Sequence, residues 1–105
     1  MREVDTLEGL KQALATSQRA VVYFHSERCP PCIWVNPIYR QIEAEYPDIV
    51  FITADIDSSE DMTSTFDISY MPTFLFCFNN TEISRFCGSN SEKLHASLYN
   101  LNLSK

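Results

Sequence analysis

Apolar and polar residues alternate along the chain with two different spacings, and these spacings predict the helices and strands. Apolar residues three or four positions apart form one stripe of a helix, whereas short apolar runs rich in β-branched and aromatic residues are typical of strands. Helices are predicted over residues 5–18, from Cys32 to about Tyr46, from a cap at Ser58 or Ser59 through Phe66, and after Gly88 with Leu94, Leu98 and Leu101. Strands are predicted over Ala20–His25, Ile49–Ile56, Thr73–Phe78 and Thr81–Cys87.

The order of these elements is α-β-α-β-α-β-β-α, which indicates an α/β fold. It predicts parallel strands joined by right-handed crossovers, followed by an antiparallel hairpin. Ala20–His25 is apolar without interruption, so we expect a central strand buried on both faces. Asn79-Asn80 is a two-residue turn that tolerates positive φ and closes the hairpin. Ser89-x-x-Glu92 resembles a capping box and is expected to start the last helix.

Composition narrows the class of protein. The chain has 105 residues, 45% hydrophobic and 12% aromatic, so we expect one domain covering 1–105 rather than a disordered chain. No apolar run approaches the ~20 residues of a membrane span. The net charge of −6 disfavours nucleic acids and anionic membranes as partners. The first residues, Met1–Asp5, lack the apolar core of a secretory signal, and we therefore expect a cytoplasmic location.

The pair Cys29 and Cys32, separated by two prolines, lies where a predicted strand ends and a helix begins. If Cys29 is the N-cap, Pro30 occupies the first helical position, where proline is favoured. Cys32 then lies on the same face, within disulfide reach. A helix N-terminus stabilises a thiolate and lowers the pKa of a cysteine there, and the neighbouring Arg28 is expected to add to this effect. A C-x-x-C beside a βαβ pattern indicates redox chemistry.

Other uses of the four cysteines stay open at this point. A zinc site needs a second Cys or His pair at suitable spacing, and none is evident, so we expect no metal. A structural disulfide without turnover is a further alternative. Cys77 and Cys87 lie in the predicted hairpin and are interpreted as small buried apolar residues, with a second disulfide or a regulatory thiol as the alternative.

A larger set of features resembles the thioredoxin family over nearly the whole chain. These features are Ser26–Cys32, Pro37, Asp55-Ile56-Asp57, Met71-Pro72-Thr73 and Gly88. The resemblance implies the thioredoxin fold, a central mixed sheet of four to five strands flanked by helices on both faces. It also implies that Pro72 is a cis-proline facing the disulfide, that the backbone of Met71 pairs with an extended substrate, and that Gly88 permits close approach of that substrate.

The sequence departs from the family pattern at four positions. Arg28 and His25 stand where the family commonly has Trp, Tyr23 where it has a buried Asp, and Thr53 where it has Lys. That Asp is thought to relay a proton for the second cysteine. Strand alternation places His25 on the face of Tyr23, and one hypothesis gives His25 part of this relay. The alternative is a hydrogen-bonded, partly exposed histidine.

The resemblance implies a protein dithiol–disulfide oxidoreductase, an enzyme that acts as a thioredoxin-type disulfide reductase and electron carrier in cell redox homeostasis. Cys29 is the expected nucleophile and Cys32 the resolving thiol. The cysteine pair is the only redox group expected, with no further cofactor. Protein disulfides are the expected substrates, a thioredoxin reductase is the expected electron donor, and the chain is expected to be a monomer.

Two rival functions and one residue stay open. A binding module with idle cysteines would use Arg28, Trp34, Tyr70 and Met71 to hold a partner, and the same residues, with Pro72 and Gly88, are the expected substrate surface of the reductase. An oxidase or isomerase of an oxidising compartment is the other rival. Trp34 is either a substrate-facing anchor or part of the helix packing.

Overall fold

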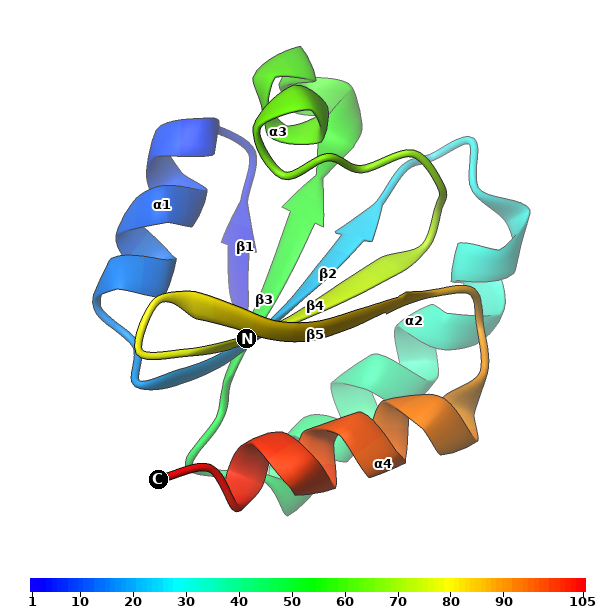
Figure 1. Ribbon diagram of the computed structural model, residues 1–105. Helices are drawn as coiled ribbons and strands as arrows, with labels where there is room; N and C mark the ends of the chain where they lie inside the picture. Colours follow the sequence, from blue (N-terminus) through cyan, green and yellow to red (C-terminus); the bar gives the residue numbers. More distant parts are fainter.

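The computed structural model describes residues 1–105 and contains one five-stranded sheet with strand order β1-β3-β2-β4-β5 (Figure 1). The elements in chain order are β1 (Arg2–Val4), α1 (Leu7–Ala15), β2 (Arg19–His25), α2 (Pro30–Ile42), the 3₁₀ turn η1 (Glu43–Glu45), β3 (Val50–Asp55), the 3₁₀ turn η2 (Ile56–Ser58), α3 (Glu60–Thr65), β4 (Thr73–Phe78), β5 (Thr81–Cys87) and α4 (Ser91–Asn102).

The sheet is mixed, as the thioredoxin resemblance implies. β1 and β2 both run parallel to β3, whereas β4 runs antiparallel to β2 and β5 antiparallel to β4. β2 is the central strand, and its five inner residues are buried, which confirms the expectation from its unbroken apolar run. Asn79 and Asn80 both have positive φ at the hairpin turn, also as predicted.

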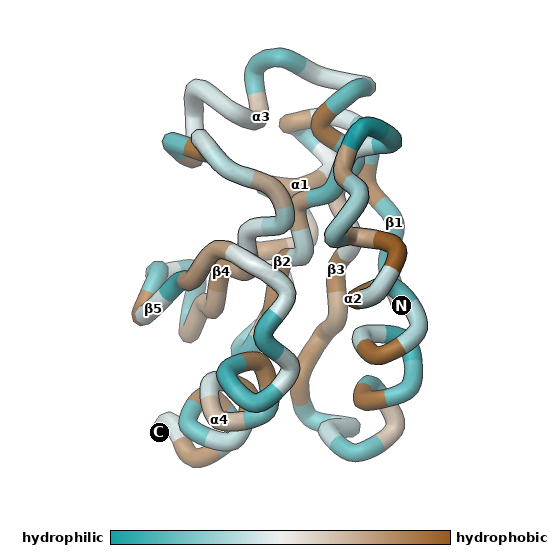
Figure 2. Tube along the Cα trace, turned by 90° about the vertical axis from the view of Figure 1, so that its right-hand side faces the viewer, coloured by the Kyte–Doolittle hydropathy of each residue, from teal (hydrophilic) through white to brown (hydrophobic).

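Two apolar clusters, one on each face of the sheet, form the core. The alternation of β2 sends Val21 and Tyr23 to the cluster that contains α2 and α4, and Val22 and Phe24 to the cluster that contains α1 and α3. Figure 1 shows the two helix pairs on opposite sides of the sheet. Figure 2 shows β3 and β4 as largely hydrophobic segments, whereas α2 and α4 alternate between hydrophobic and hydrophilic residues. The expectation of helices on both faces is therefore confirmed.

The structure corrects two details of the predicted elements. Strand β1 has no counterpart among the predicted elements, and it forms by pairing Arg2 with Ile52 and Val4 with Ala54. The capping box at Ser89 was wrong, because α4 begins one residue later. Its N-cap is Asn90, whose side chain accepts the N–H of Lys93.

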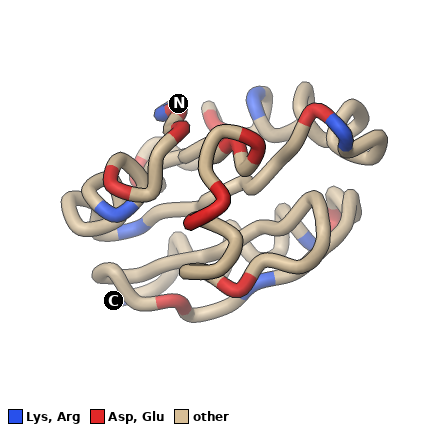
Figure 3. Tube along the Cα trace, turned by 90° about the horizontal axis from the view of Figure 1, so that it is seen from above, with Lys and Arg blue, Asp and Glu red and all other residues tan.

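Charged residues cover the outside of this framework. Figure 3 shows that neither sign forms a continuous stripe along the chain, although acidic positions outnumber basic ones. None of the helices is long and apolar enough to cross a membrane.

Candidate functional site: a disulfide at a helix N-terminus

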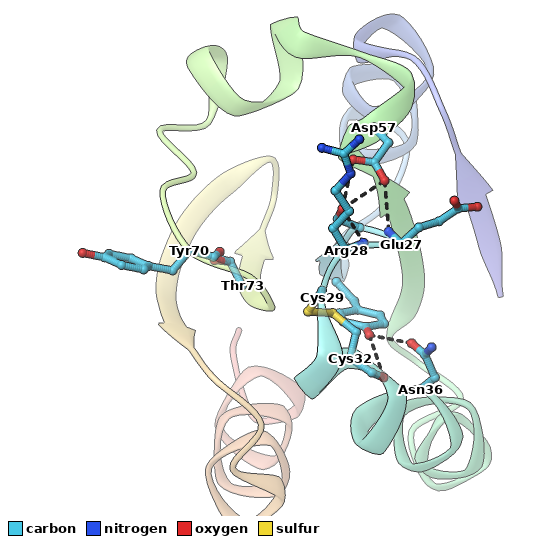
Figure 4. Close-up of a disulfide and its surroundings, with 10 residues drawn as sticks. Glu27, Arg28, Cys29, Cys32, Asn36, Asp57, Tyr70 and Thr73 are labelled. Carbon is cyan, nitrogen blue, oxygen red and sulfur yellow. Dashed lines mark hydrogen bonds between the residues drawn. A yellow bond between two sulfur atoms is a disulfide. The ribbon is translucent and has the colours of Figure 1, made fainter.

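Cys29 and Cys32 form a disulfide in the first turn of α2, with an S–S distance of 2.09 Å and Cα atoms 5.3 Å apart (Figure 4). Cys29 is the N-cap and Pro30 the first helical residue, as the spacing predicts. The N–H of Cys29 donates to the carbonyl of Ser26 at 3.2 Å, and that of Cys32 donates to the carbonyl of Cys29 at 3.0 Å. Pro30 and Pro31 have no N–H, so the first backbone donor after Cys29 is the N–H of Cys32, which donates to the carbonyl of Cys29.

A cis peptide bond joins Met71 to Pro72 at the start of β4, as the resemblance implies. The side chain of Met71 packs against both apolar clusters, one of which contains the two cysteines, and Figure 4 shows the neighbouring Tyr70 and Thr73 across from the disulfide. The backbone N–H and C=O of Met71 make no hydrogen bond within the chain. They are free to pair with an extended segment of another molecule.

Gly88 closes the same corner from β5. Its N–H donates to the carbonyl of Pro72 at 2.9 Å, and its φ of +112° is a conformation that favours glycine. A Cβ at this position would meet no heavy atom within 4 Å, so the space outside Gly88 is open. The positive φ explains the glycine, and the open space leaves room for another molecule at this corner.

Several exposed side chains surround the disulfide turn. Trp34 is 75% exposed and Tyr70 71% exposed, and Arg28 is exposed as well. Cys32 and Val35 face the core, so Trp34 lies on the outer side of α2, and its interpretation as helix packing is wrong. Sequence reasoning missed the neighbouring Ile33, which is 70% exposed.

Tyr23 occupies the buried space beneath the first turn of α2. Its hydroxyl donates to Oδ1 of Asn36 at 2.5 Å and lies 3.4 Å from the carbonyl oxygen of Cys32. The Tyr23 ring stacks on Phe74, with centroids 5.0 Å apart. Burial raises the pKa of Tyr23 to about 12, against a smaller opposing effect of Arg40. The hydroxyl is therefore a neutral donor at physiological pH.

His25 lies beside Tyr23, on the same face of β2, as alternation predicts. The two rings have centroids 5.3 Å apart. The His25 imidazole is half-buried and makes no hydrogen bond to the Tyr23 hydroxyl or to either cysteine. Its role in proton transfer therefore stays a prediction.

Asp57 holds the segment that precedes Cys29, a contact that the sequence analysis missed. Its carboxylate accepts the hydroxyl of Ser26, at 2.9 Å from each oxygen, and the N–H of Glu27 at 3.0 Å. The Glu27 N–H and then the Ser26 hydroxyl hold the pKa of Asp57 below its usual range, and the charges of Arg28 and His25 add to this effect. The only feature of the sequence that pointed to this contact was the position of Asp57, an acidic residue just after a strand predicted to be parallel to β2.

The other two cysteines are free thiols. Cys77 is buried in β4, as interpreted, and burial raises the pKa of its thiol to about 11. The same interpretation was wrong for Cys87, which is exposed. β5 is the outermost strand, where Phe86 faces the core and the next residue faces solvent. No group of three or more His, Cys, Asp or Glu side chains is arranged to hold a metal ion.

A disulfide in the first turn of a helix, next to a cis-proline loop with a free backbone, defines a protein that exchanges thiols and disulfides. Comparison with known proteins agrees with this class. The family model described as Thioredoxin matches residues 3–100, and the chain belongs to the thioredoxin family. It is a protein dithiol–disulfide oxidoreductase with the thioredoxin fold.

Individual relatives show how closely the chain follows the family. It is 39% identical to a thioredoxin of Ophiophagus hannah over 84 residues, which is 80% of each chain. It is 30% identical to a thioredoxin of Callithrix jacchus over 100 residues, 93% of this chain and 95% of the relative. Among solved structures, Plasmodium falciparum thioredoxin superimposes with a TM-score of 0.91 at 25% identity, covering 95% of this chain and 98% of that one.

Proposed function

We propose that the protein acts mainly as a reductase of protein disulfides, with Cys29 as nucleophile and Cys32 as resolving thiol. The observation that carries the proposal is the position of the pair. Cys29 is the N-cap of α2, where the helix dipole favours a thiolate, and Cys32 lies one turn on in the same cluster. The disulfide of the structure is the product state of such a reaction.

The reaction proceeds in two balanced exchanges. The reduced Cys29 thiolate attacks one sulfur of the substrate disulfide, so that a mixed disulfide forms and the first substrate sulfur leaves as a thiolate that takes up a proton. Cys32 then loses its proton and attacks the Cys29 sulfur. The second substrate thiolate leaves, and the Cys29–Cys32 bond forms. Two electrons pass from the pair to the substrate.

The substrate surface in this proposal surrounds the disulfide. An extended substrate segment pairs with the free backbone of Met71, next to Pro72, and the open space at Gly88 admits its main chain. The exposed side chains of Arg28, Trp34 and Tyr70 contact the segments on either side. These roles rest on exposure and on the unpaired backbone.

Regeneration of the dithiol completes the proposed cycle. We assign this step to a thioredoxin reductase, because proteins named thioredoxin are the chain's relatives over most of its length. The cysteine pair is the only redox group that the reaction requires. A reducing compartment such as the cytoplasm suits a pair that must return to the dithiol.

Insulin reduction with a thioredoxin reductase and NADPH tests the assignment. We expect the parent protein to reduce insulin and Cys29→Ser to lose activity entirely, because no thiolate is left at the helix N-terminus. Cys32→Ser is expected to stall with insulin attached to Cys29, visible as a mixed disulfide on a non-reducing gel. Cys77→Ser is the matched control and keeps its activity, since Cys77 is buried away from the pair.

Two outcomes would contradict the proposal. Equal activity of the parent and either active-site variant would reject turnover through the pair and favour a binding module. A measured reduction potential near that of strong oxidants, about −120 mV, rather than near the −270 mV typical of thioredoxin, would favour an oxidase instead.

A further inference from the structure

We propose that Asp57 is a positioning residue for disulfide exchange, because its carboxylate fixes the backbone of residues 26–28 and so sets where Cys29 and Arg28 face the substrate. The proposal rests on the proposed reductase function. Asp57 acts on the nucleophile Cys29 indirectly, through the loop of residues 26–28. Asp57 lies just beyond the end of β3, in η2.

The hydrogen bonds form a chain from β3 to the nucleophile. Asp57 accepts the N–H of Glu27 directly, and it accepts the Ser26 hydroxyl. That hydroxyl in turn accepts the N–H of Arg28 at 3.1 Å. The carbonyl of Ser26 then accepts the N–H of Cys29 at 3.2 Å. Every backbone N–H from Glu27 to Cys29 therefore depends on Asp57 or on Ser26.

Asp57 is in turn positioned by Asp55, the last residue of β3. Its N–H donates to Oδ1 of Asp55, the last residue of β3, at 2.9 Å. Asp55 pairs with His25, the last residue of β2, in the parallel register. The carboxylate thus joins the ends of two core strands to a loop that has no regular structure of its own. On the other side of Cys29, two consecutive prolines stiffen the turn.

The charges around Asp57 also bear on the nucleophile. Arg28 and His25 attract the carboxylate, whereas Glu27 and Asp55 are like charges close to it. Figure 4 shows the Arg28 side chain directed toward Asp57 rather than toward the disulfide. Asp57 and a Cys29 thiolate would therefore compete for the Arg28 charge, and the expectation that Arg28 supports the thiolate stays a prediction.

Three substitutions separate position from charge. Ser26→Ala removes the bridging hydroxyl and keeps the carboxylate charge. Asp57→Ala removes both the acceptor and the charge, and Ser26→Ala/Asp57→Ala combines the two. Asp61→Asn is the control, since it neutralises an exposed carboxylate of α3 that makes no side-chain hydrogen bond to the loop.

Insulin reduction at 0.15 M ionic strength, where exposed charges are largely screened, is the first measurement. We expect Ser26→Ala and Asp57→Ala each to lower kcat/KM by about tenfold, the size of effect that one or two lost hydrogen bonds produce. The double variant is expected to be no worse than Asp57→Ala, because both residues act through the same bonds. Asp61→Asn is expected to stay within about twofold of the parent.

The pH dependence of Cys29 alkylation by iodoacetamide is the second measurement, and a purely structural role would not change it. Removing the carboxylate in Asp57→Ala leaves Arg28 free, so the pKa of Cys29 is expected to fall, whereas Ser26→Ala is expected to leave it closer to the parent value.

The outcomes distinguish the two proposals. If the parent protein does not reduce insulin, the proposed reductase function fails. If the parent is active and both single variants stay within about twofold of it, or if the two single effects multiply in the double variant, the positioning role of Asp57 is overturned. If Asp57→Ala fails to fold, Ser26→Ala alone, with its loss of activity and retained pKa, still decides.

Discussion

Tyr23 shows how a single residue changes the chemistry beneath the disulfide. The thioredoxin resemblance places a buried carboxylate at this position, and this chain places a phenol there, with its ring packed among Phe74, Tyr39 and His25. A carboxylate exchanges a proton near neutral pH when buried, but a hydroxyl with a pKa of about 12 does not. The resolving cysteine therefore has a hydrogen-bonding neighbour rather than a base.

Tyr23→Phe tests this view of the hydroxyl. We expect the variant to lose about 1 kcal/mol of unfolding free energy at pH 8, because the bond to Asn36 is lost. The folded pKa of Tyr23 is raised above its ordinary value of 10.0, so its stabilising contribution is complete below pH 10.0 and declines as pH rises toward about 12. A rise of this size corresponds to roughly 2.7 kcal/mol, so the stability difference between parent and variant should shrink and then change sign over this range.

Urea denaturation of the oxidised proteins at several pH values is the measurement. A difference that stays constant from pH 8 to 11 would contradict the assigned pKa.

Insulin reduction by Tyr23→Phe gives a second result, since a base at this position would make the variant lose the neutral limb of its pH–rate profile. We expect that limb to be unchanged.

At the scale of residues, the sequence predicted the reactive cysteine pair but not the side chain that holds the loop before it. Cys29 and Cys32 are neighbours in the chain, so local helix geometry was enough to pair them. Asp57 acts on residues some thirty positions earlier, and its contact exists only because β2 and β3 end side by side. No local rule predicts a partner at that separation.

Helices and strands with a regular spacing of apolar residues were predictable from the sequence. A strand that forms only because a neighbouring strand pairs with it was not. All four helices and the four strands from β2 to β5 follow the predicted order, with ends that differ by a few residues. β1 has three residues and one apolar side chain, so it forms a strand only because β3 supplies the hydrogen bonds. Periodicity cannot detect a strand of this length.

The start of α4 is a prediction at this scale. Asn90→Ala is expected to cost about 1 kcal/mol of unfolding free energy, because the side chain that accepts the N–H of Lys93 is lost. Ser89→Ala is the matched control, and its expected cost is below about 0.5 kcal/mol because Ser89 is exposed and outside the helix. Urea denaturation measures both. A larger loss in Ser89→Ala than in Asn90→Ala would restore the capping box.

The whole molecule carries a net charge of −6, and acidic residues lie close to the reactive loop. They are Glu27 in the loop itself, Asp57, which accepts hydrogen bonds from the loop, and Asp55, which accepts the N–H of Asp57, against Arg28 alone from the loop. A field of this sign attracts cationic reactants and repels anionic ones over about one Debye length.

Reduction of two small disulfides tests the effect of this field. At ~10 mM ionic strength, where the Debye length is about 30 Å, cationic cystamine is expected to react several times faster than anionic dithiodiglycolate, relative to their rates with free dithiothreitol. The preference should largely disappear at ~1 M salt. Glu27→Gln, which neutralises an exposed carboxylate of the loop itself, should weaken it. A ratio that does not depend on salt would contradict the role of the carboxylates.

The two edge strands of the sheet determine whether it can pair with a strand of another molecule. One border is the three-residue β1, and the ammonium group of Met1, just before this strand, pairs with Glu43 at 2.6 Å. The other is β5, where Arg85 pairs with Glu82 and also donates to the carbonyls of Phe66 and Asp67. Because a short edge strand and a charged one both disfavour pairing with a strand of another molecule, we expect little edge-to-edge association of this sheet.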